Sequence, residues 1–301
     1  MARSYRRAIL PVLVMTSLLV GCSSTPSTPT SAELPEIDGE FGQAPGFSWS
    51  GTQPPEDLVV EVLHEGEGPE VTPESMVVVD YEGHVWGSEE AFDSSFNSDH
   101  FGHFPLDGVI QGWTEGISGN SVGSRLLLSI PSDLGYGDQG TQDGRIEGGD
   151  TLVFVVDVHG TYTQDETGGD PAAEEVDLPE DVGIDVEGDL GQPFSVTIDE
   201  DTEEPSSLAS YPVSQSDKAE LGEGDTALVS YIATTWDNDV LGATWLDPLG
   251  PDGGPQQVTI DDGSFFGELR GYRVGSRVVI VQPATEDDPA VAVGIDILAA
   301  K

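Results

Sequence analysis

The sequence predicts an α+β protein in which one short helix packs against an antiparallel β-sheet, and it predicts this unit twice. Three observations lead to the expectation: segments in which apolar and polar residues alternate, a single short helical segment, and motifs that recur in the second half of the chain. Alternation with a period of two is typical of strands with one face in a core. A helix packed on such a sheet forms a layered α+β domain.

Four segments of the first half have strand character. Residues 58–63 are rich in valine, and residues 76–86, 125–130 and 151–159 alternate between apolar and other residues. The side chains placed together on one face are Val77, Val79, Tyr81, Gly83 and Val85, then Leu126, Leu128 and Ile130, and finally Leu152, Phe154, Val156 and Val158. One short helix is expected from about residue 111 to residue 118, although Gly112 and Gly116 weaken it.

Short motifs recur at a nearly constant distance along the chain. Leu34-Pro35-Glu36 returns as Leu178-Pro179-Glu180, which is 144 positions later. Val122-Gly123-Ser124-Arg125 returns as Val274-Gly275-Ser276-Arg277, which is 152 positions later. An ordered series at a nearly constant offset indicates the duplication of one domain rather than chance turn residues.

The first residues have the pattern of an export signal. Arg3, Arg6 and Arg7 precede an apolar run over residues 8–20, which is shorter than the ~20 residues of a membrane span. Residues 19–22 resemble the bacterial lipobox, in which the cysteine is lipidated, and Cys22 is the only cysteine of the chain. An internal disulfide is therefore excluded. The alternative is a secretory signal cleaved elsewhere, which would leave an idle thiol at Cys22.

The chain is predicted to have five parts. Residues 23–32 are rich in serine, threonine and proline and cannot form a core, and residues 163–177 are small and acidic. The predicted organisation is a signal peptide (1–21), the lipidated Cys22 with a flexible tether (22–33), a first domain (34–162), an acidic linker (163–177) and a second domain (178–301).

The charge of the chain is strongly negative. Its 301 residues include 56 acidic and 10 basic residues, for a formal net charge of -46. Nucleic-acid binding is excluded, because neutralising phosphates needs clustered lysine and arginine. Two interpretations stay open: solubility through mutual repulsion, and adaptation to high salt, where the repulsion is screened.

Six motifs stand in order between residues 57 and 162. They are Val79-Asp80-Tyr81-Glu82-Gly83, Phe92-Asp93-Ser94-Ser95, Val109-Ile110-Gln111-Gly112-Trp113, Val122-Gly123-Ser124, Leu134-Gly135-Tyr136-Gly137 and Thr151-Leu152-Val153-Phe154. This ordered series resembles the FKBP family of peptidyl-prolyl cis-trans isomerases, or rotamases. The resemblance implies an FKBP-like sheet wrapped around one helix, and an enzyme that acts on X-Pro bonds.

Rotation about an X-Pro bond crosses a barrier of ~18–20 kcal/mol. Twisting the amide removes its resonance and much of its charge separation, so an apolar cleft that excludes water favours the twisted form. Such a site needs no nucleophile, so we expect no cofactor and no metal. His100 and His103 form the one weak candidate for a metal site, and an exposed turn is the competing interpretation.

The resemblance assigns roles to single residues. Trp113 would form the floor of a cup for the prolyl ring, and the Ile110 N–H would hold the substrate carbonyl. The implied catalytic set is Tyr81, Phe92, Asp93, Ile110, Trp113, Tyr136 and Phe154, with Val109 and Ile146 as substrate-binding residues. The loop rim departs from the family, because Arg145 precedes Ile146 and Glu147 follows it. Another departure is the rim near Gly102, which lacks the bulky aromatic residue of many family members, and Phe101 is the candidate to substitute for it.

The second domain is predicted to be a degenerate FKBP-like copy without the site. By the offset, the position of Phe92-Asp93 falls near Ala243-Thr244, and Trp113 is matched by Phe265. The segment that carries Tyr136 has no counterpart of similar length. Partner binding, dimerisation and spacing all stay open as uses for this domain.

The predicted function is isomerisation of X-Pro bonds in exported polypeptides, in support of protein folding outside the cytoplasm. The expected partners are proline-containing polypeptides and the membrane, which the chain would reach through the lipid on Cys22 at the outer face of the bacterial cytoplasmic membrane. The main alternative is a non-catalytic peptide-binding or chaperone lipoprotein, and a weaker one is an inert structural lipoprotein. The sequence does not determine the oligomeric state.

Overall fold

The computed structural model describes residues 34–49, 53–98, 100–163, 166–246 and 254–301. The described residues belong to one compact unit. The predicted signal peptide, Cys22 and the tether lie outside the described residues. Within the described residues, no helix is long and apolar enough to cross a membrane.

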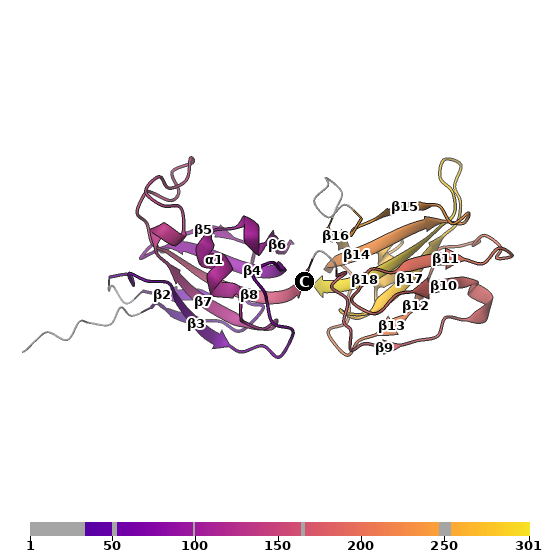
Figure 1. The fold of residues 1–301 in the computed structure, drawn as a ribbon, viewed down its shortest axis with the longest axis horizontal. Helices are drawn as coiled ribbons and strands as arrows, with labels where there is room; N and C mark the ends of the chain where they lie inside the picture. Colours follow the sequence, from indigo (N-terminus) through magenta and orange to yellow (C-terminus); the bar gives the residue numbers. More distant parts are fainter. Residues whose placement is uncertain (1–33, 50–52, 99, 164–165, 247–253) are drawn as a thin grey trace, which may run out of the picture. The chain divides into compact units, whose positions relative to one another are not determined.

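The first half of the chain, here called the N-terminal lobe (residues 34–162), contains a six-stranded antiparallel sheet. The strands in spatial order are β3 (Val59–His64), β7 (Arg125–Ile130), β8 (Leu152–Tyr162), β4 (Met76–Val85) and β5 (Ala91–Ser94), while β6 (Gly102–Pro105) also pairs with β4. The helical elements are η1 (Leu106–Gly108), α1 (Gln111–Ile117) and η2 (Ser132–Leu134). The predicted α+β arrangement is confirmed, and Figure 1 shows α1 lying over the sheet.

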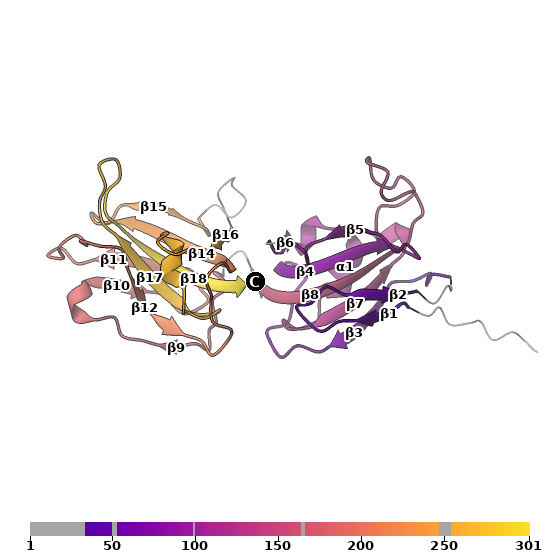
Figure 2. The ribbon, with the colours of Figure 1, turned by 180° about the vertical axis from the view of Figure 1, so that it is seen from behind.

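The two faces of this sheet pack against different elements. On one face, Leu126, Leu128 and Phe154 form a core with Trp113 and Ile117 of α1. On the other face, the alternate side chains Leu127, Val153 and Val155 pack against apolar residues of the N-terminal hairpin and of the turn after β4, namely Leu34, Ile37, Phe47, Trp49 and Trp86. The hairpin consists of β1 (Glu36–Asp38) and β2 (Gly46–Ser48), and Figures 1 and 2 place it beside β7. The strict alternation in the sequence therefore gives two cores, one on each side.

A buried ion pair joins the hairpin loop to the sheet. Arg125 is 2% exposed and Asp157 is 0% exposed, and the Arg125 Nε and Nη2 atoms donate to the two Asp157 oxygens at 2.6 and 2.8 Å. Arg125 also donates to the carbonyl oxygens of Gly39 and Gln43 at 2.7 and 2.6 Å. The guanidinium and the carboxylate thus satisfy each other and fix the loop between β1 and β2.

The second half of the chain, here called the C-terminal lobe (residues 166–301), repeats this topology. Its sheet has the order β12 (Ala209–Pro212), β17 (Arg277–Gln282), β18 (Val291–Ala300), β14 (Thr226–Thr235) and β15 (Val240–Ala243), and β16 (Gln256–Thr259) also pairs with β14. A hairpin of β10 (Ile184–Glu187) and β11 (Ser195–Ile198) packs on it. The remaining short elements are η3 (Glu180–Val182) and η4 (Phe266–Leu269).

The same buried ion pair occurs in the C-terminal lobe. The Arg277 Nε and Nη2 atoms donate to Asp296 at 2.7 and 3.0 Å, and Arg277 also bonds the carbonyl oxygens of Gly188, Asp189 and Gln192 in the hairpin loop. Both lobes therefore use one arginine to hold a hairpin against the sheet, and the predicted repeat is confirmed at the level of topology.

Two expectations need correction. Residues 163–177 are more than a linker, because β9 (Glu174–Glu175) pairs with β13 (Ser214–Gln215) and the side chain of Thr167 is buried against Asp296. The register of β15 also differs from the offset estimate. Gly83 pairs with Asp93 in one lobe and Ala233 pairs with Gly242 in the other, so Gly242 and not Ala243-Thr244 stands at the Asp93 position.

Candidate active site

A cavity of about 740 Å³ opens in the N-terminal lobe beside α1. Eight of the predicted site residues line it: Tyr81, Phe92, Asp93, Val109, Ile110, Trp113, Tyr136 and Phe154. Phe104, Gly108, Gln111, Asp133, Leu134 and Gly135 complete the wall. Segments from β4, β5, β6, α1, β8 and the loop after β7 thus converge on one hollow.

Aromatic rings surround the indole of Trp113, which is only 5% exposed. The rings of Tyr81, Phe104 and Phe154 stand edge-on to it, with centroids 5.4, 5.6 and 5.3 Å away. Edge-to-face packing at these distances favours a fixed ring geometry. The result is an apolar cup in which three aromatic rings surround the Trp113 indole.

Phe104 is a cup residue that the sequence reasoning did not identify. Phe101 was expected at this rim, but it is 5% exposed and packs in a separate cluster with Val78 and Tyr162. Alternation within β6 is the signal that could have identified Phe104. Gly102 and Phe104 lie on the same face of this strand, which pairs with β4, and from there the Phe104 ring reaches the Tyr81 ring.

Among the described residues that line the cup, Tyr81 and Asp93 form the only polar pair that connects two of its walls. The Tyr81 hydroxyl donates to Asp93 Oδ2 at 2.7 Å, and the Ser94 N–H donates to the other carboxylate oxygen at 3.0 Å. Burial, and then the neighbouring Asp93 carboxylate, raise the pKa of Tyr81 above its ordinary value. The hydroxyl therefore stays protonated at neutral pH and holds the carboxylate in one orientation.

Gly83 allows two walls of the cup to approach each other. A Cβ atom at this position would lie 2.6 Å from the Phe92 ring and 2.6 Å from the Phe154 ring. These two rings meet edge-on with centroids 5.5 Å apart. The β4–β5 register also shifts after Gly83, which is the local irregularity expected of a β-bulge. Only glycine at this position lets both aromatic rings enter the cavity.

The Ile110 backbone lies where α1 begins. Its carbonyl oxygen accepts from the N–H groups of Trp113 and Thr114 at 2.9 and 3.3 Å, and its extended φ/ψ ends the preceding segment. Among the described residues, no acceptor is bonded to the Ile110 N–H. This donor at the cavity wall fits the predicted hydrogen bond to a substrate carbonyl.

Tyr136 and Ile146 belong to the same long loop but have different environments. Tyr136 is 41% exposed and lines the cavity. Ile146 is 3% exposed and packs within the core cluster, and it is not part of the cavity wall. The Ile146 side chain therefore holds the polar loop on the core, and its predicted contact with substrate stays a prediction.

Arg145 fastens this loop to β5. Its Nη1 donates to the Phe92 carbonyl oxygen at 2.5 Å, and its Nε donates to Asp143 Oδ2 at 2.5 Å. Hydrogen bonds from Thr141 and Arg145 lower the pKa of Asp143 to about 2. Arg145, one of the rim residues at which this chain departs from the family, thus links the loop to the strand that carries Phe92 and Asp93.

The two histidines considered for metal binding have different partners. The ring of His103 contacts the Tyr162 hydroxyl, and burial lowers the pKa of His103. His100 Nδ1 lies 3.2 Å from Gln257 Oε1. No group of three histidine, cysteine or acidic side chains among the described residues has the arrangement of a metal site.

Known proteins are similar to this chain over the region that contains the cup. The family described as FKBP-type peptidyl-prolyl cis-trans isomerase matches residues 68–159. An FK506-binding protein of Streptomyces anulatus is 38% identical over 130 residues, covering 42% of this chain and 97% of that protein. A probable FK506-binding protein of Corynebacterium glutamicum is 40% identical over 126 residues, again covering 42% and 97%. The isomerase FkpA of Escherichia coli is 36% identical over 123 residues, covering 41% of this chain and 43% of FkpA. The chain belongs to the family of FKBP-type peptidyl-prolyl cis-trans isomerases.

Proposed function

We propose that the aromatic cup of the N-terminal lobe rotates X-Pro bonds in exported polypeptides, and that it does so outside the cytoplasm. The observation that carries this proposal is the Tyr81–Asp93 hydrogen bond set in the wall of an apolar cup around Trp113. The activity itself is that of the family. The export of the substrates and the role of each residue are the proposed parts.

The geometry suits stabilisation of a twisted amide. A prolyl ring in the cup would lie on Trp113 between Tyr81 and Phe154, with water excluded from the imide. The Ile110 N–H would hold the substrate carbonyl, and Tyr136 would reach the peptide from the loop. Because the twisted amide has less charge separation than the planar one, the apolar wall favours the twisted form.

Removing either partner of the polar pair should reduce catalysis. We expect Tyr81→Phe and Asp93→Asn to lower kcat/KM by about tenfold or more, the rate equivalent of about 1.4 kcal/mol. Tyr272→Phe is a matched control, because this hydroxyl bonds Ser210 in the C-terminal lobe. The measurement is a protease-coupled or NMR exchange assay of an X-Pro peptide with the full chain.

The same assay separates the isomerase from a non-catalytic binding protein. A wild-type chain that is folded and binds proline peptides, but does not accelerate their isomerisation at low or high salt, would contradict the proposed function. In that case, peptide capture by the cup would be the better interpretation.

We further propose that a lipid on Cys22 anchors the chain to the outer face of the cytoplasmic membrane. Residues 19–22 carry this part of the proposal, and durable anchoring needs more than one acyl chain. Cys22→Ala should release the protein from the membrane fraction and remove the lipid mass seen by mass spectrometry, whereas Ser23→Ala should change neither. Retention of Cys22→Ala in the membrane fraction would contradict lipid anchoring.

The C-terminal lobe is proposed to be a degenerate copy that does not isomerise X-Pro bonds. Gly242 replaces Asp93 by register, so Tyr231 has no carboxylate partner at that position. Leu241 stands at the Phe92 position and is 60% exposed. The four-residue η4 takes the place of α1, with Phe265 at its start as the predicted counterpart of Trp113. A cup of the kind seen in the first lobe needs residues that this lobe has lost.

A further inference from the structure

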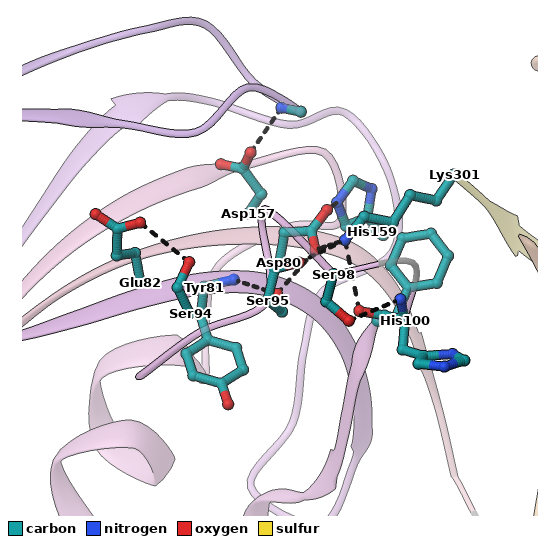
Figure 3. A network of polar contacts seen from close by, with 12 residues as sticks. Asp80, Tyr81, Glu82, Ser94, Ser95, Ser98, His100, Asp157, His159 and Lys301 are labelled. Carbon is teal, nitrogen blue, oxygen red and sulfur yellow. Dashed lines mark hydrogen bonds and ion pairs between the residues drawn. The ribbon is translucent and has the colours of Figure 1, made fainter. Parts of the chain in front are cut away.

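A polar cluster lies directly behind the Tyr81 wall of the cup (Figure 3). Asp80 precedes Tyr81 in β4, and its side chain is 4% exposed. Its carboxylate accepts from Ser95 Oγ at 2.8 Å and lies 3.1 Å from His159 Nε2. A buried carboxylate needs partners of this kind, because an unpaired charge in the interior is costly.

The third partner of Asp80 comes from the C-terminal lobe. Lys301 Nζ donates to Asp80 Oδ1 at 2.6 Å and to the Ser95 carbonyl oxygen at 2.8 Å. The ammonium also lies 5.3 Å from the centroid of the Phe101 ring and 3.4 Å from the His100 carbonyl oxygen. Figure 3 shows the Lys301 side chain reaching this cluster. The ammonium thus meets one carboxylate and two carbonyl groups.

The Lys301 backbone is fixed at the end of the second sheet. Its N–H donates to Thr226 O, and its carbonyl oxygen accepts from Thr226 N–H, both at 3.0 Å. The Lys301 side chain is 20% exposed. A lysine whose backbone is held in this way loses less freedom on forming an ion pair than one in a loop.

A chain of hydrogen bonds leads from Lys301 to the cup. Ser95 Oγ donates to the same Asp80 oxygen that Lys301 binds, and accepts from the Tyr81 N–H at 3.0 Å. The Ser95 N–H donates back to the Tyr81 carbonyl oxygen at 2.9 Å. Asp80 directly precedes Tyr81 in the chain, and Ser95 follows Asp93 by two residues. Lys301 therefore contacts a close neighbour of each partner in the Tyr81–Asp93 hydrogen bond.

A second residue of the C-terminal lobe contacts the same region. Gln257 Oε1 accepts from the Phe101 N–H at 3.0 Å, and Gln257 Nε2 donates to the Phe101 carbonyl oxygen at 3.2 Å. An apolar cluster shared by the two lobes surrounds Phe101 and contains Val78, Tyr162, Leu228, Leu298 and Ala299. Hydrogen bonds and apolar contacts between the two lobes therefore both support the position of Lys301.

We propose that Lys301 is a positioning residue for the isomerase site, and that the C-terminal lobe thereby sets the geometry of the Tyr81–Asp93 pair. This inference rests on the proposed function of the cup. It gives the degenerate lobe a use other than catalysis: it supplies the cation that completes the cluster behind the active site. In the C-terminal lobe, Ser230 stands at the Asp80 position by register, so the arrangement is not repeated there.

Charge supports a specific role for Lys301. The chain has only two lysines, Lys218 and Lys301, among 10 basic and 56 acidic residues, and Lys301 is the one whose carboxylate partner is almost fully buried. Burial raises the pKa of Asp80, but the hydrogen bonds from His159 and Lys301 outweigh it and hold the pKa below the ordinary value. The cluster is mostly shielded from water, so salt screens the pair less than it screens a surface pair.

The test compares Lys301→Met with Lys218→Met and Lys301→Arg in the full chain. Lys218 is a matched control, because it forms an ion pair with Asp170 at 3.0 Å and is 51% exposed. We expect Lys301→Met to lower kcat/KM by about two- to thirtyfold, the range over which indirect coupling acts. Lys218→Met should match the wild type, and Lys301→Arg should recover much of the activity.

NMR gives the readout that general destabilisation would not produce. In Lys301→Met, the amide resonances of Tyr81 and Ser95 should shift and the pKa of Asp80 should rise, while the resonances of Trp113 in α1 stay close to those of the wild type. Unchanged Tyr81 and Ser95 resonances, or equal losses of activity in Lys301→Met and Lys218→Met, would refute the positioning role. Absence of activity in the wild type would instead refute the proposed function, and the NMR comparison would still decide whether Lys301 positions this pair.

Discussion

Replacing Arg125 with methionine should lower the free energy of unfolding of the N-terminal lobe by about 3–5 kcal/mol, because the change leaves a buried carboxylate without its partner. Asp157 is 0% exposed and takes two hydrogen bonds from Arg125. The methionine would also release the carbonyl oxygens of Gly39 and Gln43, and with them the loop that closes the hairpin on the sheet. Urea denaturation followed by circular dichroism measures the loss.

A second substitution tests whether the unpaired carboxylate, and not a loss of packing, lowers the free energy of unfolding. In Arg125→Met with Asp157→Leu, no unpaired charge remains, so we expect most of the stability to return, since apolar replacement of a buried pair is often close to neutral. Arg273→Met is the control for losing an exposed arginine, because Arg273 is 45% exposed and the Glu220 carboxylate lies 3.7 Å away. A double variant as unstable as Arg125→Met alone would show that the ion pair is not the reason.

Alanine at position 112 should disturb both stability and catalysis. A Cβ atom on Gly112 would lie 2.3 Å from Ile130 Cγ2 and 2.9 Å from Ile130 Cδ1. Ile130 is fully buried, so α1 must move away from the sheet, at a cost of about 1–3 kcal/mol for overpacking. Trp113 is the next residue and would move with the helix. We expect kcat/KM to fall by about ten- to hundredfold, because small misplacements of this kind are costly.

Gly116 provides the matched control within the same helix. A Cβ atom there would lie 3.1 Å from Leu128 Cδ2 and 3.4 Å from Leu128 Cδ1, which are the ends of a flexible side chain. Alanine also favours a helix over glycine by about 1 kcal/mol. Gly116→Ala should therefore keep its activity and its stability. Equal losses in the two variants, measured by the isomerase assay and by urea denaturation, would contradict the packing argument for Gly112.

Much of the fold and of the cup followed from local patterns. Alternation within residues 76–86 and 151–159 placed Tyr81 and Phe154 on core faces, and the structure has β4 and β8 there. The short helix predicted near residues 111–118 is α1, from Gln111 to Ile117. These features depend on the period of a strand or helix, which is a property of neighbouring residues and is therefore present in the sequence.

Other features could not be predicted because they depend on which strands become neighbours. Phe101 and Phe104 are similar apolar residues on either side of Gly102, yet only Phe104 reaches the cup. Ile146 belongs to the loop that was expected to form the rim, but its side chain lies in the core. The role of a residue in a loop or short strand follows from the register of its partner strand, and the sequence alone does not set that register.

By itself, the sequence determined the family, the repeated α+β topology and most of the residues that line the cup, since each of these depends on motifs or on periodicity. The tertiary structure alone decided how distant charges pair. Arg125 meets Asp157, and Lys301 meets Asp80, across large separations in the chain. The physical reason is that a buried charge is stable only beside its partner, and folding, not spacing in the sequence, brings the two together.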